Sequence, residues 1–230
     1  MKKSYIVLAL LSIVGIAFAV FPVWLPSLDT LVNWGLVAML LAVLVVLAFF
    51  LKFESVALGS KGIALVAMLA TMSAVLRIPF AAIPSLQPCT FLIICSGYVF
   101  GPVAGFMVGA MTPLISNFFL GQGPWTLYQM LAWGLIGSGA AYLPRFSLGR
   151  KGFIIAGVIC GFFFGLVTNI YFWLYFAYPL TFSTLLVAQL SSLWFDTSHA
   201  IGNAIFLGLF GLRTIAILER YKKRFSWIYA

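Results

Sequence analysis

Four carboxylates are the only acidic side chains among the 230 residues, and their positions limit the chemistry open to this chain. They are Asp29, Glu54, Asp196 and Glu219, and no two of them are close together in the sequence. Acid–base catalysis by a carboxylate pair, or metal binding by an Asp-rich motif, needs several acids together. The G-x-x-x-x-G-K-[ST] motif of a P-loop is also missing, so this chain does not hydrolyse ATP in that way. We therefore predict a binding protein, not an enzyme, with no catalytic residue, no cofactor and no metal site.

Polar side chains that could bind a ligand begin with Asp196, His199 and Asn203. At about 100° per residue on a helix, these three fall within about 60° of one another and form one polar stripe. An acid one turn from the only histidine suggests an ion pair or a hydrogen bond between them. Alternatively, Asp196 serves only to cap the helix, where a carboxylate suits the free N–H groups. Both interpretations can hold together.

Three further segments combine amides with aromatic rings near predicted helix ends. The first is rich in proline, the second contains the turn Gly121-Gln122-Gly123-Pro124, and the third ends a long apolar run. Trp and Tyr at helix ends are usually membrane-interface residues, but the interleaved amides favour a pocket for a medium-sized, partly planar ligand. Together with the stripe, the candidate substrate-binding residues are Arg77, Gln87, Asn117, Gln122, Trp125, Tyr128, Gln129, Trp133, Asn169, Trp173, Asp196, His199 and Asn203.

The elements that must position these residues are transmembrane helices. Hydrophobic residues make up 64% of the chain and charged residues only 7%, too few to cover a water-facing surface. Apolar runs of about twenty residues are long enough to cross the hydrocarbon core as helices. We predict an all-α integral membrane protein with about eight transmembrane helices. The predicted spans are residues 4–22, 31–51, 62–77, 88–100, 102–119, 126–143, 152–177 and 196–218.

The net charge of +9 has its origin in membrane topology and not in nucleic-acid binding. With these spans, every Lys and Arg except Arg77 falls on one side of the membrane. Positive charge marks the cytoplasmic side, so we expect a multi-pass protein of the plasma membrane with both termini in the cytoplasm. The basic C-terminal tail either contacts anionic lipid headgroups of the bilayer or acts only as a topology signal.

The chain divides into two parts. Residues 1–54 form a two-helix transmembrane hairpin that is poor in buried polar groups, and residues 55–230 form a six-helix core that carries the candidate site. The beginning of the chain also resembles a secretory signal with a cleavage site at Ala17-Phe18-Ala19. Because the apolar run is long for a signal, we favour a retained first helix.

Five features follow one another from Gly62 onward: the small-residue helix at 64–74, the loop that begins at 77–79, the glycine-rich turn at 97–110, the segment 122–126 and the stripe at 196–203. In their order the sequence resembles the substrate-binding (S) components of energy-coupling factor (ECF) vitamin transporters. The resemblance covers roughly residues 62–220 and departs from the six-helix form of that family in the extra hairpin.

The resemblance implies a vitamin-type small molecule bound from the outer face, and partnership with an ECF coupling transmembrane subunit and two ATPase subunits. It implies that the small-residue face of Ala67, Ala70, Thr71 and Ala74 contacts the coupling subunit, although packing within this chain would explain that face as well. The ligand that we favour is cobalamin or a related corrinoid, with riboflavin, thiamine-related compounds and a queuosine precursor as alternatives. The rival function is a proton-coupled secondary transporter of a small organic solute that uses Asp196 and His199.

Overall fold

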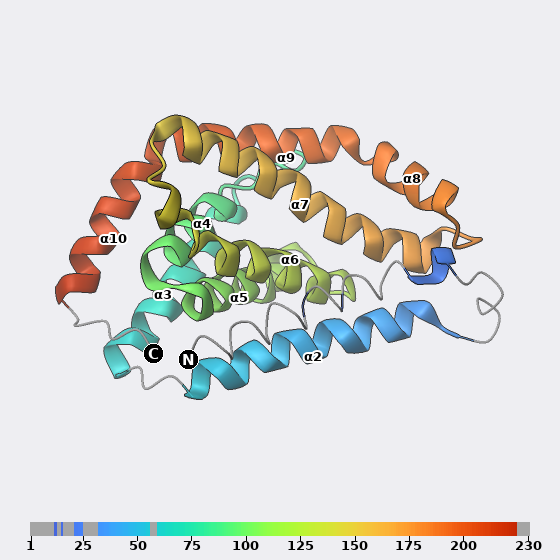
Figure 1. Ribbon diagram of the computed structural model, residues 1–230, viewed down its shortest axis with the longest axis horizontal. Coiled ribbons are helices and arrows are strands. Elements are labelled where there is room, and N and C mark those ends of the chain that lie inside the picture. Colours follow the sequence, from blue (N-terminus) through green and yellow to red (C-terminus); the bar gives the residue numbers. More distant parts are fainter. Residues whose placement is uncertain (1–11, 13–14, 16–20, 25–31, 56–58, 225–230) are drawn as a thin grey trace.

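The computed structural model describes residues 12, 15, 21–24, 32–55 and 59–224 (Figure 1). Within these ranges the protein is helical and has no β-strand, which confirms the predicted fold class. Five of the described helices are long and apolar enough to cross a membrane. The first predicted span, residues 4–22, and the signal-peptide alternative fall largely outside the described residues.

The helices follow one another with short connections. A single 3₁₀ turn, η1 (Phe21–Trp24), precedes α2, and a second, η3 (Leu143–Phe146), precedes α7. The longer helices are α2 (Trp34–Ser55), α3 (Ser60–Arg77), α4 (Cys89–Phe100), α5 (Pro102–Leu120), α6 (Trp125–Ala140), α7 (Arg150–Phe176), α8 (Phe182–Ser191), α9 (Leu193–Phe206) and α10 (Leu212–Arg224).

Glycines allow α4, α5 and α6 to pack with their backbones almost in contact. Gly101 joins α4 to α5 at φ 92°, a conformation that side chains with a Cβ rarely adopt. A Cβ on Gly97 or on Gly105 would lie 1.9 Å or 2.3 Å from the carbonyl oxygen of Gly137 on α6. Small residues at such crossings let transmembrane helices approach closely. These three helices therefore cross at the distance of backbone contact.

Helix α2 lies on the outside of this core, against α5, α6 and α7 (Figure 1). The ring of Phe49 stacks on that of Phe106 of α5, with centroids 3.7 Å apart and planes 2° from parallel. Near the other end of α2, the hydroxyl of Tyr175 donates to the carbonyl of Gly35. The remaining side of α2 exposes leucines and valines, as expected for a surface that faces lipid.

The structure differs from the expected spans between residues 178 and 224. The short helix α8 was not predicted; it begins with a capping box, in which the Thr181 side chain accepts from the backbone N–H of Thr184. The Thr184 hydroxyl also accepts from the indole of Trp173, which holds α8 against α7. Phe182 and Leu190 on α8 are exposed, so this helix presents an apolar surface. Helical structure thus begins well before residue 196, where the eighth span was expected to start.

The last predicted span, residues 196–218, is also not one straight helix. Leu207–Gly211 forms one π-helical stretch, η4, after which α10 turns across the end of the bundle (Figure 1). Helices from Leu193 to Arg224 would measure about 48 Å if straight, more than the roughly 30 Å of a hydrocarbon core. Helix α10 packs against the end of α4, and this contact buries Ile215 and Leu218.

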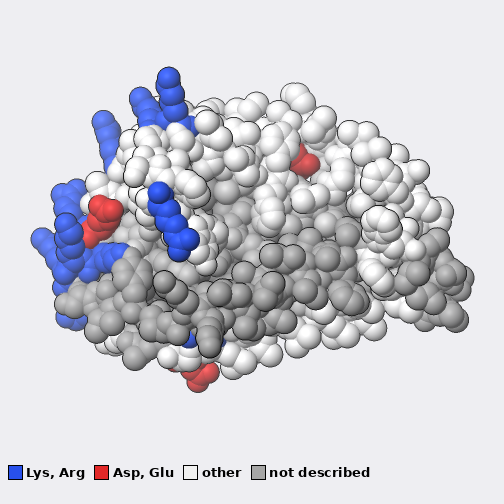
Figure 2. All heavy atoms as spheres, viewed as in Figure 1, with Lys and Arg blue, Asp and Glu red and all other residues white. Residues whose placement is uncertain are grey.

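Basic residues gather at the end of the molecule that holds α10, the end of α2 and the beginnings of α3 and α7 (Figure 2). We call this the basic end. The chain alternates between it and the opposite end, where α3 and α5 end and α4 and α6 begin. Arg77 lies at that opposite end, as the spacing of the spans predicts.

Candidate functional site

Arg77, the last residue of α3, is the centre of a buried polar network at the opposite end. It is only 6% exposed. Its Nε donates to Oε1 of Gln87 at 2.6 Å, and its Nη1 donates to Ser116 Oγ at 2.8 Å and to Asn117 Oδ1 at 2.6 Å. The guanidinium carbon also lies 4.9 Å from the centre of the Trp133 ring, within cation–π range. One side chain thus ties α3, α5, α6 and the loop of residues 78–88 together.

Asn117 extends the network to the beginning of α6. Its Nδ2 donates to Thr126 Oγ1 at 2.8 Å and to Gln129 Oε1 at 2.9 Å. The Thr126 hydroxyl in turn donates to Gln122 Oε1 at 3.0 Å, in the connection between α5 and α6. The predicted candidates Arg77, Gln87, Asn117, Gln122 and Gln129 therefore form one hydrogen-bonded group.

His199 belongs to a second buried chain, whose donors can be assigned from the bonding groups. The Ser85 carbonyl can only accept, so Nδ1 of His199, 2.9 Å away, carries the proton. The Trp133 indole can only donate, so Thr90 Oγ1 accepts from it at 3.0 Å. The Thr90 hydroxyl then donates to Nε2 of His199 at 3.1 Å. The neutral form of the imidazole satisfies all of these bonds, and its ring stacks on Phe164.

These bonds dock the loop of residues 78–88 on α9. Besides His199, Ser198 donates from its hydroxyl to the carbonyl of Pro84 at 2.8 Å. The Leu86 side chain lies so close to Gly202 that a Cβ there would be 2.6 Å from it. Since Gln87 is held by Arg77, the loop is tied at one end to α3 and along its length to α9.

Asp196 lies apart from His199, although the two share one helix. Its Oδ2 accepts from Asn169 Nδ2 at 3.0 Å and from the Ser192 hydroxyl at 2.8 Å. These partners lie on α7 and just before α9, whereas His199 bonds to α4 and to the loop. The expected pairing of Asp196 with His199 is therefore wrong. The helix turns Asp196 toward α7 because Gly165 leaves room for the carboxylate there.

The other predicted residues lie in several places. Asn203 faces Gly157 on α7, nearer the basic end; its Nδ2 donates to the Gly157 carbonyl at 3.3 Å, and its Oδ1 has no partner among the described residues. Trp125 is 41% exposed at the start of α6. Trp173 is buried and bonded to α8. Only part of the predicted set therefore forms a single group.

The small-residue face of α3 divides in two. Ala70 and Ala74 are buried within the chain, whereas Ala67 and Thr71 are exposed. The expectation that all four contact a partner is therefore corrected for Ala70 and Ala74, which pack inside this chain in this conformation. The exposed residues, with Met68 beside them, remain available for contact.

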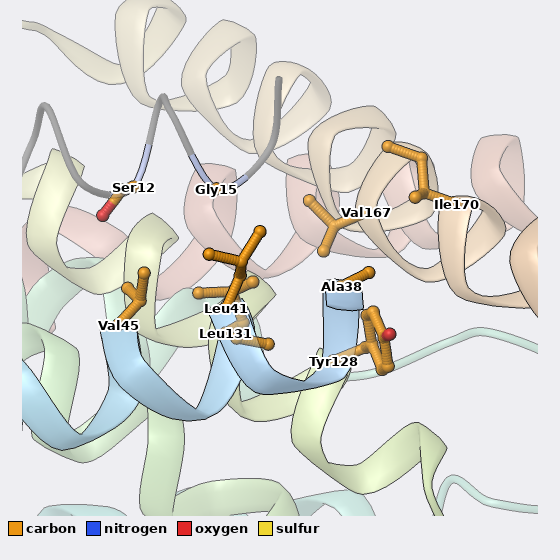
Figure 3. Close-up of a pocket in the computed structure, with 10 residues that line it drawn as sticks. Ser12, Gly15, Ala38, Leu41, Val45, Tyr128, Leu131, Val167 and Ile170 are labelled. Carbon is orange, nitrogen blue, oxygen red and sulfur yellow. The ribbon is translucent and has the colours of Figure 1, made fainter. Parts of the chain in front are cut away.

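An apolar cavity of about 30 Å³ lies between α2, α6, α7 and residues 12 and 15. Figure 3 shows Leu41 of α2 near Val167 of α7, with Tyr128 at one side. The Tyr128 hydroxyl is buried and has no hydrogen-bond partner in the described part of the chain. The cavity has the volume of about one water molecule, far below that of a vitamin. A second hollow, between the side chains of α10, lies at the basic end.

Six participants in these bonds were not among the predicted residues: Thr90, Ser85, Ser116, Thr126, Ser192 and Ser198. Thr90 is the second residue of α4, directly after the proline-rich loop, and Ser116 precedes Asn117. The sequence signal that could have identified them is a hydroxyl close to a predicted candidate in a transmembrane helix, because buried polar groups need hydrogen-bond partners.

Comparison with known families decides the class of protein. The family model described as "ECF transporter, substrate-specific component" matches residues 61–217, which is more than half of the chain. The chain belongs to the substrate-specific components of ECF transporters. This S component is therefore a multi-pass membrane transport subunit; its family implies a small-molecule substrate and partnership with ECF transmembrane and ATPase subunits. No match was found among curated proteins or among solved structures.

Proposed function

We propose that this S component binds a vitamin-type small molecule at the end of the bundle that holds Arg77 and His199. In this proposal that end faces outward from the plasma membrane, and both termini are cytoplasmic. The bound molecule is then delivered with one coupling transmembrane subunit and two ATPase subunits. The hairpin of residues 1–54 is an addition to the six-helix core of residues 55–230.

One observation carries the proposal: a charged side chain and a histidine are buried at the same end of a membrane bundle, and both hold one loop. Arg77 and His199 bond to Gln87 and to the Ser85 carbonyl. Polar groups inside a membrane protein are costly and mark substrate paths. We infer that the loop of residues 78–88 releases these bonds when the ligand enters, and that the freed donors and acceptors then bind the ligand.

The rings around this network favour a bulky ligand with few charges. Trp133 and Phe164 have ring centroids 4.3 Å apart, and Tyr128 and Tyr171 form a second pair at 4.9 Å. Aromatic walls with a few polar groups suit such molecules. Cobalamin or a related corrinoid is the first ligand to test, and riboflavin, thiamine-related compounds and a queuosine precursor belong in the same panel.

The test is a thermal-shift screen of that panel on the purified chain, with mass spectrometry of molecules that co-purify. Trp125→Ala and Gln129→Ala, both on α6 at the end that holds Arg77, should weaken binding of the ligand found by about tenfold, the loss of one good contact, without lowering expression. Trp194→Ala is the matched control, because that indole is 76% exposed on α9. Unchanged affinity in both test variants would show that the binding site lies elsewhere.

The rival function, proton-coupled secondary transport, makes a different prediction. It requires uptake by this chain alone that collapses when a proton ionophore is added. The proposed function requires uptake that depends on co-expressed coupling and ATPase subunits and is insensitive to the ionophore. Asp196 and His199 bond to different partners, so they do not form the acid–histidine pair that proton-coupled transport would use in this chain.

A further inference from the structure

Arg77 carries a full positive charge that no neighbouring side chain neutralises. Its three hydrogen-bond partners, Gln87, Ser116 and Asn117, are all uncharged, and no carboxylate of a described residue forms an ion pair with it. The side chain is buried, and an arginine keeps its proton in proteins, so it cannot become neutral there. A buried charge without an opposite charge beside it is costly.

The acids that the structure describes lie elsewhere. Glu54 and Glu219 are at the basic end, at the end of α2 and on α10. Asp196 accepts its hydrogen bonds from α7 and from the residue that precedes α9. Two weaker effects favour the charge of Arg77: it lies in the last turn of α3, where the helix dipole is negative, and its guanidinium faces the Trp133 ring. Both effects come from partial charges, which do not balance a full one.

The shape of the guanidinium adds a second argument. Its Nη1 uses both hydrogens within the bundle, for Ser116 and Asn117 of α5. Its Nε donates to Gln87 in the loop of residues 78–88, and its Nη2 has no hydrogen-bond acceptor among the described residues. Nε and Nη2 lie along one edge of the guanidinium plane, and the two oxygens of a carboxylate or a phosphate fit such an edge. Gln87 contributes one amide oxygen to an edge that can bind two oxygens.

We propose that the Nε–Nη2 edge of Arg77 binds an anionic group of the substrate, a carboxylate or a phosphate, in the place that Gln87 occupies. This inference rests on the proposed function, since it takes this end as the substrate site and the loop as the part that opens. Release of Gln87 frees Nε beside Nη2, while α5 keeps hold of Nη1, so the guanidinium is already oriented for two parallel hydrogen bonds. The substrate class therefore narrows to ring-bearing molecules with one acid group.

Matched aromatic fragments test the charge of the ligand before the vitamin itself is identified. The probes are benzoate, its uncharged analogue benzamide, and phenyl phosphate. Each is titrated into the purified full chain at constant ionic strength while the melting temperature is measured. We expect a saturable rise with an anionic fragment and binding of benzamide at least about tenfold weaker, because hydrogen bonds between charged groups are stronger than those to an amide. The stronger response of benzoate or of phenyl phosphate identifies the acid group as a carboxylate or a phosphate.

Gln87→Glu tests whether Arg77 is the group responsible. The change keeps the size of the side chain and puts a carboxylate beside Nε, where it competes with the anion of the fragment. We expect a higher melting temperature without any fragment, and an apparent dissociation constant for the anionic fragment raised by more than about tenfold. Asn33→Asp is the matched control, because it also turns an amide into an acid at this end. Asn33 is exposed just before α2, and its side chain accepts from the backbone N–H of Leu36.

Three results would overturn the inference. One is a response to benzamide equal to the responses to benzoate and phenyl phosphate, which would leave the proposed site in place for an uncharged ligand. Another is no response to either anionic fragment, in which case the vitamin panel decides the proposed function on its own. The third is a response to the anionic fragments that Gln87→Glu and Asn33→Asp leave equally unchanged, which would place the bound anion away from Arg77.

Discussion

Replacing Arg77 by lysine keeps the positive charge but removes the planar fork that three partners share. The guanidinium donates to Gln87, Ser116 and Asn117 at 2.6 to 2.8 Å. A lysine ammonium is a point charge on a flexible stem, and it cannot reproduce the paired directions of Nε and Nη1. If it keeps one bond of the three, two charged hydrogen bonds are lost at about 1.5–3 kcal/mol each. We therefore expect Arg77→Lys to lower the free energy of unfolding by about 3–6 kcal/mol.

Buried cysteines provide the assay. Cys89 and Cys95 are fully buried, so in a Cys160→Ala background, which removes the partly exposed third cysteine, a thiol-reactive dye labels them only when the helices separate. The dye therefore reports a melting temperature for the detergent-solubilised protein. Arg213→Lys, an exposed arginine on α10, is the matched control and should melt like the natural chain. If Arg77→Lys melts with the control, within about 1 °C, the network does not contribute to stability as argued.

Two further changes test the packing and the hydrogen bonds around the site. Gly105→Ala places a Cβ 2.3 Å from the backbone oxygen of Gly137, so it should destabilise the protein by about 1–3 kcal/mol or more. The control is Gly139→Ala, whose Cβ would have no atom within 4 Å and which should be neutral in the same melting assay. Equal melting temperatures for these two variants would contradict the close helix crossing. Thr90→Val keeps the shape of the side chain but leaves two groups without a partner, the Trp133 indole N–H and Nε2 of His199, which should cost about 2–4 kcal/mol. Faster proteolytic cleavage of the 78–88 loop in this variant would report its release, and an unchanged cleavage rate would count against the docking role.

The boundaries of several helices could be predicted from sequence because local signals mark them. The expected spans at 88–100 and 102–119 correspond to Cys89–Phe100 and Pro102–Leu120. Gly101 and Pro102 separate them, and glycine and proline are strong local markers. The region from 180 to 195, which contains neither glycine nor proline, gave no such signal. Its hydroxyl and amide side chains lower the hydropathy, yet they cap α8 and bond to α7.

The candidate site could be predicted in part. Composition placed the polar groups at one end of the spans, and several of them meet around Arg77. Helical periodicity put Asp196 and His199 on one stripe, but a stripe about 60° wide can contact two different neighbours. Which neighbour each residue meets depends on tertiary packing, here on Gly165 of α7. The regular spacing of Gly157, Gly161 and Gly165 was a signal for that contact, since small residues four apart form helix interfaces.

The central claim is that this chain is a substrate-specific subunit powered by partners. Uptake of the radiolabelled ligand from the screen, measured in vesicles that contain the chain with or without its coupling and ATPase subunits, tests it most directly. The account predicts accumulation only with all subunits present and with ATP inside, unaffected by a proton ionophore. Accumulation by the chain alone, driven by a proton gradient, would contradict it.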